Sequence, residues 1–479
     1  MIPLQLVQQP TKASRIVAYP FGDTSAILYH SLLNQPEKLD FEDAAERDTF
    51  LSELNGSGVE TGLDDLDQLL STDDTAARSQ VRSRQERYTA DTRSLVNWFS
   101  LMTAEVCNLG CSYCIAGRNM DDAASKRSIL MPFEIAKAGI DWYHSLVTRT
   151  QRRAYVNFSG GEPLANRDVT LRAASYARGL FADFPLEMSI NTNATLVDNE
   201  VAAHLSANRV AIATSLDGVP AASDAVRVTK AGLGASSRIL DGWRRLMDAG
   251  CELTGFMATI NDKNYHHLDT GIIDFAREWG FSWVRVSYDV LHLLHVPVAQ
   301  AAERVWSIYQ YGRKHGITVE GFWTTAIHNL TQSATGGGKV AFFCGAVLGE
   351  TISVHPDGRL SACGFSSGNF GNVRQADAFN WDLHRELVSS YYAGARDFCH
   401  GCEIEGSCAG GCNISRELSS CNGNDSAIRY SCDLYREMTK RLLLAHFEDE
   451  PVAEPGAAAD GGRDPGFSEF TVAQRGRRC

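Results

Sequence analysis

The placement of the cysteines is the feature that most constrains this 479-residue chain. Eleven of the thirteen cysteines fall into two groups, and only Cys251 and Cys479 stand apart. The N-terminal sequence MIPLQLVQQPTKASRIVAYPF lacks the basic start and apolar core of a secretory signal. We therefore expect a cytoplasmic protein, whose thiols stay reduced. Grouped cysteines in that setting indicate metal binding or catalysis before disulfides.

Charge and hydropathy exclude two classes of partner. The net charge of −13 opposes general binding to nucleic acid or to anionic membranes. The chain has no run of the ~18–20 consecutive apolar residues that a membrane helix needs. Hydrophobic residues make up 44% of the chain, which is ordinary for a globular protein. We expect no nucleic-acid partner and no membrane segment.

From about Asn97, short apolar runs alternate with longer segments of helical period. The expected strands are 99–106, 155–158, 186–191, 210–215, 252–260 and 283–288. The expected helices between them are 132–147, 166–181, 198–205, 236–249 and 264–279. Strands separated by helices predict an α/β fold with a parallel sheet covered by helices. Such sheets carry their chemistry at the carboxyl ends of the strands.

The flanking regions differ in composition. The first 98 residues contain β-like runs at 15–19 and 25–29, helices at 44–54 and 63–70, and a charged linker or solvated helix at 71–91. A helical bridge is expected at 298–331, and the tail is rich in Pro, Gly, Ala and acid, which favours disorder. The expected domains are an N-terminal α+β extension (1–98), the α/β domain (99–325), a cysteine-rich domain (326–445) and a tail (446–479).

The first cysteine group directly follows an expected strand, in the sequence EVCNLGCSYCIAG. Its members are Cys107, Cys111 and Cys114, in the spacing C-x3-C-x2-C. A tetrahedral metal or a cubane cluster takes four ligands, so three thiolates leave one position open. A structural zinc site is the alternative, although zinc sites more often show paired C-x2-C arms.

This motif, with Tyr113 before the third cysteine, resembles that of the radical S-adenosylmethionine (SAM) superfamily. The resemblance implies a partial (β/α)6 TIM-like barrel. It also implies a [4Fe–4S] cluster on the three thiolates, with SAM on the fourth iron. One electron from the cluster then cleaves SAM to a 5′-deoxyadenosyl radical. An electron donor such as flavodoxin or ferredoxin is an implied partner.

Further motifs follow in the order of that superfamily. Residues 159–163 (SGGEP), 191–195 (NTNAT, with Ala194 in place of the usual Gly) and 215–218 (SLDG) each end an expected strand, and Asp224-x-x-Arg227 follows. A carboxylate suits the SAM ammonium and an arginine suits its carboxylate. The residues that the resemblance implies for SAM binding are Tyr113, Gly160, Gly161, Glu162, Asn191, Asn193, Ser215, Asp217 and Arg227.

The second cysteine group resembles the SPASM domain, with the spacing C-x13-G-x4-C followed by C-x2-C-x5-C-x3-C and a final Cys. That resemblance implies two auxiliary [4Fe–4S] clusters, for three in all. Auxiliary cluster I would take Cys344, Cys363 and Cys412. Auxiliary cluster II would take Cys399, Cys402, Cys408 and Cys432.

The fourth ligand of auxiliary cluster I stays open at this point. Cys421 is favoured by ligand chemistry, Glu350 lies between the first two motif cysteines, and an open iron is the third alternative. His355 reads as a turn or core residue, Cys251 as a buried thiol, and Cys479 as incidental.

Our leading hypothesis is a maturase that crosslinks a ribosomally synthesised peptide through a thioether, carbon–carbon or related bond. The N-terminal extension would recognise a leader peptide as an added strand. The first alternative is maturation of a protein, either by formylglycine formation as in anaerobic sulfatase maturases or by crosslinking of an enzyme subunit. The formylglycine branch has an Asp base where Gly364 stands here. A non-catalytic iron–sulfur or zinc scaffold is the second alternative. No catalytic residue is assigned, although Tyr288 and Asp289 end the sixth strand.

Overall fold

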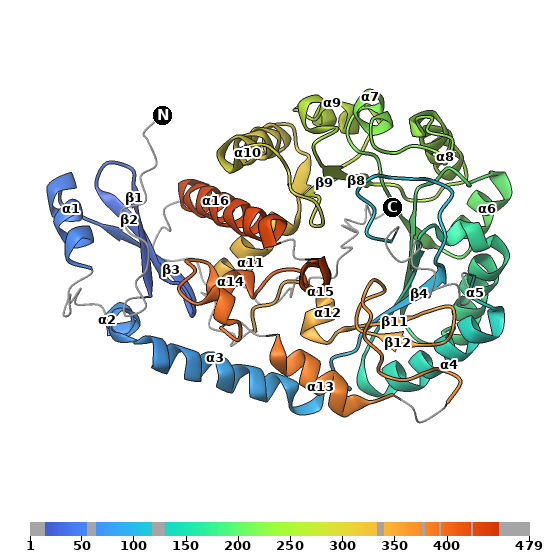
Figure 1. Ribbon diagram of the computed structural model, residues 1–479, viewed down its shortest axis with the longest axis horizontal. Helices are drawn as coiled ribbons and strands as arrows, with labels where there is room; N and C mark the ends of the chain where they lie inside the picture. The colour runs from blue at the N-terminus through green and yellow to red at the C-terminus, as the bar shows by residue number, and fades with distance from the viewer. Residues whose placement is uncertain are drawn as a thin grey trace.

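A curved wall of parallel strands forms the centre of the fold (Figure 1). The computed structural model describes residues 15–54, 64–116, 130–332, 340–375, 379–391, 394–422 and 425–449. One sheet has the order β12-β11-β4-β5-β6-β7, and a second has the order β10-β9-β8. A single parallel bridge between Ser215 and Met257 joins β7 to β8, so the two sheets continue as one wall. All neighbouring strands pair in parallel except β12, which is antiparallel to β11.

The strands of the wall are short and mostly buried. Their bounds are β4 (Trp98–Ala104), β5 (Ala154–Gly160), β6 (Leu186–Thr192), β7 (Val210–Thr214), β8 (Gly255–Ile260), β9 (Trp283–Tyr288), β10 (Thr318–Glu320), β11 (Thr351–Val354) and β12 (Leu360–Ser361). Every residue of β4 is buried, as expected for a central strand covered on both faces. The predicted α/β partial barrel is confirmed, and all six predicted strands form.

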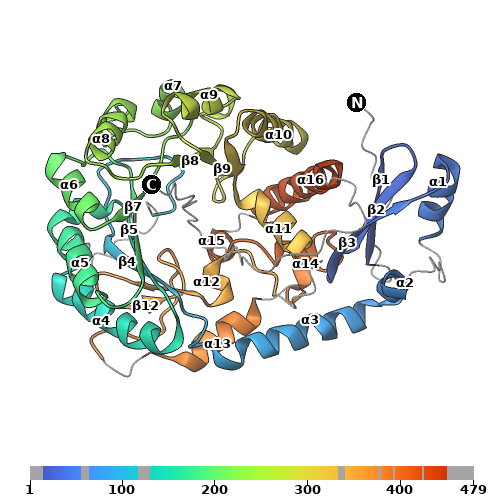
Figure 2. The ribbon, with the colours of Figure 1, turned by 180° about the vertical axis from the view of Figure 1, so that it is seen from behind.

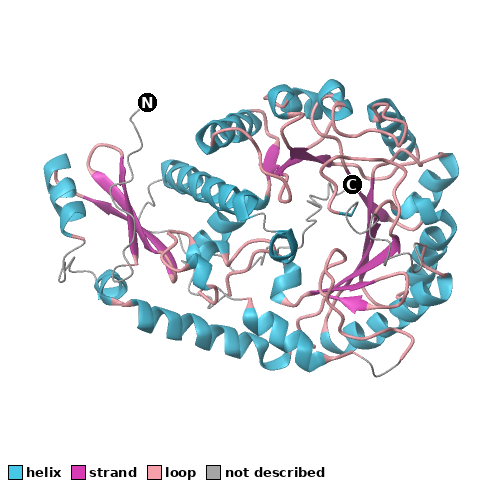
Figure 3. Ribbon diagram, viewed as in Figure 1, coloured by secondary structure: helices cyan, strands magenta, loops and turns pink. Residues whose placement is uncertain are grey.

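Helices cover the outer face of the wall (Figures 1 and 3). They are α4 (Phe133–Thr150), α5 (Arg167–Leu180), α6 (Asn199–Ala207), α8 (Ser236–Asp248), α9 (Gly271–Glu278) and α10 (Val298–Lys314), with the short α7 (Pro220–Asp224) before α8. Trp243 of α8 is fully buried, and its indole N–H donates to Thr214 Oγ1 at 2.8 Å. The predicted helix at 264–279 begins only at Gly271. The Asn264 side chain donates to Thr259 O and accepts from Asn261 N, and these bonds hold the preceding residues in a turn.

The N-terminal unit is an antiparallel sheet with flanking helices. It contains β1 (Ile16–Phe21), β2 (Ser25–His30), β3 (Asn34–Asp40), α1 (Ala44–Glu53), α2 (Asp64–Ser71) and α3 (Asp74–Tyr88). The sequence did not predict β3, which is polar and contains Pro36. Asn34 and Gln35 adopt positive φ angles and turn the chain back, so pairing with β2 forms the strand. In Figures 1 and 2, α3 runs from this unit toward the barrel.

The cysteine-rich segments lie between the N-terminal unit and the barrel (Figures 1 and 2). Their helices are α11 (Thr325–Gln332), α12 (Gly345–Leu348), α13 (Trp381–Ser390), α14 (Glu405–Cys408), α15 (Asn413–Asn422) and α16 (Asp425–Asp449). Strand β11 comes from this part of the chain and extends the barrel wall beside β4. The predicted disordered tail falls almost entirely outside the described residues. Within the described ranges, no helix is both long and apolar enough to cross a membrane.

Candidate active site

The first cysteine group lies on the loop that follows β4. This loop is held against the segment after α7, because Gly110 N–H donates to Val228 O at 2.8 Å and Leu109 pairs with Thr229. The pairing connects two motifs that are more than a hundred residues apart in the sequence. It brings Arg227 beside the loop that carries Cys107, Cys111 and Cys114.

A buried ionic group connects this loop to the end of β7. The Tyr113 hydroxyl donates to Asp217 Oδ2 at 2.5 Å, and Arg227 Nε lies 2.9 Å from the same oxygen. The Arg227 guanidinium also lies over the Tyr113 ring, 5.6 Å from its centroid. Burial raises the pKa of Asp217, and the charge of Arg227 opposes that rise. The contact of Arg227 Nε with Asp217 is an ion pair without the alignment of a hydrogen bond.

Glu162 ties the end of β5 to the end of β6. Its carboxylate accepts hydrogen bonds from Asn193 N at 2.8 Å, Thr192 Oγ1 at 2.8 Å and Leu164 N at 3.0 Å. The side chain is 1% exposed, and burial raises its pKa to about 7 against these three donors. Glycine is required at position 160, where φ is +140° and a Cβ would lie 2.0 Å from Ala104 O.

Two asparagines complete the edge beside the cysteine loop. Asn193 Nδ2 lies 3.6 Å from Cys107 Sγ and 3.0 Å from Asn108 Oδ1. Sequence reasoning missed Asn108, whose position next to Cys107 was the available signal. The Oδ1 atom of Asn191 is buried without a hydrogen-bond partner in the described part of the chain. A buried acceptor of this kind, at the carboxyl end of β6, can receive a hydrogen bond from a ligand.

Ala194 adopts a left-handed conformation with φ +60°, which explains why the related motif usually has glycine there. Ser215 lies at the bridge to β8 and is half-buried, so it takes part in joining the two sheets. The structure thus gathers most of the sequence-predicted SAM residues along the ends of β5, β6 and β7.

The donor chemistry of the loop fits an iron–sulfur cluster. Burial raises the pKa of Cys107 and raises that of Cys111 to about 11. Hydrogen bonds from Leu109 N and Asn193 Nδ2 oppose the rise at Cys107 and favour its thiolate. The positive charge of Arg227 does the same at Cys111. Among the described residues, no three Cys, His, Asp or Glu side chains converge closely enough to hold a single metal ion. A cubane binds its thiolates on separate irons, so its ligands lie further apart. The three thiols of the loop, with a cation and amide donors beside them, therefore fit the ligand set of a cubane cluster.

Five cysteines of the second group line a single cavity of about 250 Å³. They are Cys399, Cys402, Cys408, Cys412 and Cys432. Burial raises the pKa of Cys408 well above its usual value, and the neighbouring Cys432, Cys402 and Cys399 raise it further. A buried cavity lined by thiols fits a cluster ligated by cysteine.

The remaining cysteines of the second group lie on other elements. Cys344 precedes α12 and Cys363 follows β12, and neither lines this cavity. Cys421 belongs to α15, but its side chain is outside the described part of the structure. Burial raises the pKa of Glu350 to about 7. Cys412, predicted as a ligand of auxiliary cluster I with Cys344 and Cys363, lines the cavity of the other four cysteines. The fourth ligand of that cluster keeps the alternatives that the sequence left open.

Tyr288 and Asp289, at the end of β9, have structural partners. The Tyr288 hydroxyl donates to Ala301 O at 2.7 Å, and this side chain is buried. Asp289 accepts from Leu291 N at 2.9 Å and lies 2.7 Å from the Nδ1 atom of the half-exposed His292. His355 is also a core residue, hydrogen-bonded to Glu105 and Ser361.

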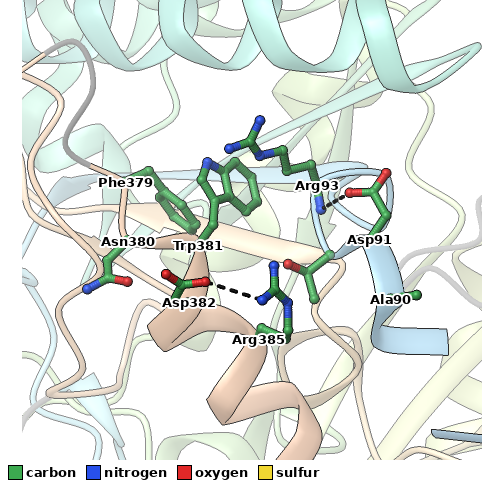
Figure 4. A pocket seen from close by; sticks show the side chains of 9 residues that line it. Ala90, Asp91, Arg93, Phe379, Asn380, Trp381, Asp382 and Arg385 are labelled. Atoms are coloured by element: carbon green, nitrogen blue, oxygen red, sulfur yellow. Dashed lines mark hydrogen bonds and ion pairs between the residues drawn. The ribbon is translucent and has the colours of Figure 1, made fainter. Parts of the chain in front are cut away.

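A different cavity, of about 490 Å³, lies between the end of α3 and the start of α13 (Figure 4). Asp382 forms an ion pair with Arg385 at 3.2 Å, and the Arg93 guanidinium lies over the Trp381 ring, 5.4 Å from its centroid. None of the candidate site residues lines this cavity. The chemistry-bearing side chains instead gather at the strand ends and in the thiol-lined cavity.

The sequence of this chain is similar to proteins of known family. Residues 101–271 match the family model of the radical SAM superfamily. The radical SAM cyclopropyl synthase TigE of Paramaledivibacter caminithermalis is 22% identical over 367 residues, covering 74% of this chain and 75% of that protein. The cysteine-type anaerobic sulfatase-maturating enzyme of Clostridium perfringens is 21% identical over 349 residues, covering 69% of this chain and 92% of that protein.

Among solved structures, native anSMEcpe with bound AdoMet superposes with a TM-score of 0.59 at 17% identity. The match covers 74% of this chain and 100% of that structure, and it shows that the two share a fold. The matched family region contains the three-cysteine loop and the ends of β4 to β8. Residues 101–271 of this chain therefore form a radical SAM domain, and the chain is an enzyme whose relatives include radical SAM maturases.

Proposed function

We propose that this enzyme is a maturase that oxidises a ribosomally synthesised peptide and closes a thioether, carbon–carbon or related crosslink within it. The observation that carries the proposal is the cavity lined by five cysteines of the second group, which would give the chain an electron-accepting site besides the first cysteine loop if it holds a cluster. Relatives named for cyclopropyl synthesis and for sulfatase maturation support a reaction on a peptide or protein. A neighbouring structure with a bound peptide, at a TM-score of 0.56, is consistent with the same class of substrate.

Different residues of the first site would bind the cluster and the two charged groups of SAM. Cys107, Cys111 and Cys114 would hold a [4Fe–4S] cluster, which supplies the electron that cleaves bound SAM to a 5′-deoxyadenosyl radical. Arg227, oriented by Asp217 and Tyr113, would receive the SAM carboxylate. Glu162 would favour the SAM ammonium while it fixes the turn at Asn193.

Formylglycine formation is less favoured by the packing at position 364. A Cβ on Gly364 would lie 2.3 Å from Met102 Sδ, so the Asp base of the formylglycine branch would fit there only if the buried Met102 side chain moved. Maturation of a protein by crosslinking remains the alternative to a peptide substrate, and the two predict partners of different size.

The N-terminal unit is the proposed recognition module. Its three-stranded sheet has outer strands β1 and β3, and among the described residues each of them pairs with β2 alone. An extended leader peptide would add to such an edge through main-chain hydrogen bonds. The unit also packs on the cysteine-rich segment, since Gly406 N–H donates to Ser31 O at 2.7 Å.

The test is co-expression of the enzyme with small peptides encoded beside it, followed by mass spectrometry of the peptides. Cluster reconstitution and SAM cleavage are confirmed on the purified enzyme. A mass decrease equal to one pair of hydrogens supports a crosslink, because each new bond removes two hydrogen atoms from the peptide. Cys107→Ala is the control and is expected to form no 5′-deoxyadenosine. Unchanged peptides with active SAM cleavage would refute the peptide proposal, and a modified larger protein would favour the alternative.

A further inference from the structure

Two arginines face the sulfur atoms of the second cysteine cavity. Arg416 Nη2, on α15, donates to Cys399 Sγ at 3.7 Å. Arg436 Nη1, on α16, donates to Cys402 Sγ at 4.0 Å. Both arginines line the same cavity as the thiols. The sequence motif marked only the cysteines, and neither arginine belongs to it.

Neighbouring side chains hold both guanidinium groups in place. Arg416 lies over the ring of Phe398, 5.3 Å from its centroid. Arg436 forms ion pairs with Asp433 and, at 3.6 Å, with Glu403. Glu403 in turn accepts a hydrogen bond from Tyr19 of the N-terminal unit at 3.1 Å. A donor that is fixed before a ligand binds loses little entropy when it interacts with that ligand.

The two arginines differ in how far neighbouring carboxylates offset their charge. Asp433 and Glu403 offset part of the charge of Arg436, whereas Arg416 forms no ion pair with the described residues. Arg416 should therefore act more strongly on the cavity than Arg436.

We propose that Arg416 and Arg436 raise the reduction potential of an iron–sulfur cluster held by Cys399, Cys402, Cys408 and Cys432. Reduction adds one negative charge to a cluster, and N–H donors and positive charges at its sulfurs stabilise that charge. The inference rests on the proposed function in one respect, namely that these thiols hold a cluster. Arg416 and Arg436 are positioning residues, because they would act on the cluster through the thiolates of Cys399 and Cys402.

The test is a redox titration of the reconstituted full chain, followed by electron paramagnetic resonance. It is repeated in a Cys107→Ala background, which removes the signal of the first site. Arg416→Gln is expected to move the midpoint of the second site to a more negative potential, with about a tenfold fall in the equilibrium constant for reduction. Arg436→Gln should give a smaller shift in the same direction. Arg416→Lys keeps the charge and should recover part of the loss.

The matched control is Arg429→Gln, because Arg429 lines the same cavity, is exposed and has no described bond to sulfur. A midpoint for Arg416→Gln that equals that of Arg429→Gln, or that moves to a more positive potential, overturns the proposal. If Arg416→Gln loses iron, Arg436→Gln carries the test, and a midpoint of that variant identical to wild type overturns the proposal instead. A wild-type chain without iron at these four cysteines would refute the cluster assignment itself, and iron analysis separates that failure from the first.

Discussion

Arg15 and Glu405 form a buried ion pair across 390 residues of sequence, with Nη1 of the arginine 2.6 Å from Oε2 of the glutamate. Their side chains are 1% and 0% exposed. Asp74 and Arg78 of α3 complete the network, in which Arg78 also lies 3.2 Å from Glu405. Glu405 lies between Cys402 and Cys408, so the N-terminal unit is attached to the loop that carries the second cysteine group.

Removal of Arg15 is expected to loosen this attachment. Arg15→Met leaves Glu405 buried with one cationic partner fewer and should lower the free energy of unfolding by about 3 kcal/mol. Amide hydrogen exchange in residues 15–54 should become faster, because the docked unit would open more often. Arg82→Met is the control, since Arg82 and Glu86 form an exposed pair whose loss should cost less than about 0.5 kcal/mol. Equal exchange rates in the two variants would contradict the role of the network.

Tyr113 gives a second test, at the first site. Tyr113→Phe removes the hydroxyl that donates to the buried Asp217 and should cost about 1.5–3 kcal/mol, because the acceptor is charged. SAM affinity should fall as well, since Arg227 loses part of its support. Tyr143→Phe is the control, because its hydroxyl bonds neutral backbone groups: it donates to Asn97 O and accepts from Tyr155 N at 3.1 Å. Its loss should cost about 1 kcal/mol for each bond and leave SAM affinity unchanged. Urea denaturation and SAM binding measure both effects, and an equal loss of SAM affinity in the two variants would contradict the assignment.

The sequence predicted the barrel strands and the strand-end motifs because both depend on local patterns. Parallel strands bring their carboxyl ends to one edge, so motifs that follow β5, β6 and β7 meet without any further information. The N-terminal strand β3 escaped prediction because NQPEKLD lacks the alternation of a strand, and its pairing with β2 supplies the stability.

Contacts between distant segments were beyond the sequence for a different reason. The pairing of Gly110 with Val228, the arginines at Cys399 and Cys402, and the Arg15–Glu405 pair each join elements whose approach depends on the completed fold. Cys432 illustrates the same limit: motif spacing predicted it as a ligand, whereas its position on the 25-residue helix α16 came only from the structure.

SAM binding should depend on pH through Glu162. Burial raises the pKa of this carboxyl to about 7 from an ordinary value of 4.5, so the folded protein binds the proton more tightly than the unfolded chain. The free energy of unfolding should therefore decrease as pH rises through that interval. SAM affinity should change in the opposite direction and increase as the carboxylate forms, because the ammonium of SAM prefers a negative partner. Equilibrium binding on either side of pH 7 measures this, and Glu162→Gln should bind weakly with little pH dependence in that range. A wild-type affinity that is independent of pH would contradict the role of Glu162.

Gly364 tests why this chain departs from the formylglycine branch. Gly364→Asp would place a Cβ 2.3 Å from Met102 Sδ of the fully buried strand β4, so overpacking should lower the free energy of unfolding by about 1–3 kcal/mol. Gly179→Asp is the control: a Cβ at this exposed position of α5 has open space, and the stability should change by less than about 0.5 kcal/mol. Thermal denaturation of the two variants gives the comparison. If Gly364→Asp were as stable as wild type and produced formylglycine in a sulfatase peptide, the glycine would be a change of specificity and not a packing requirement, and formylglycine formation would regain its place as a function of this fold.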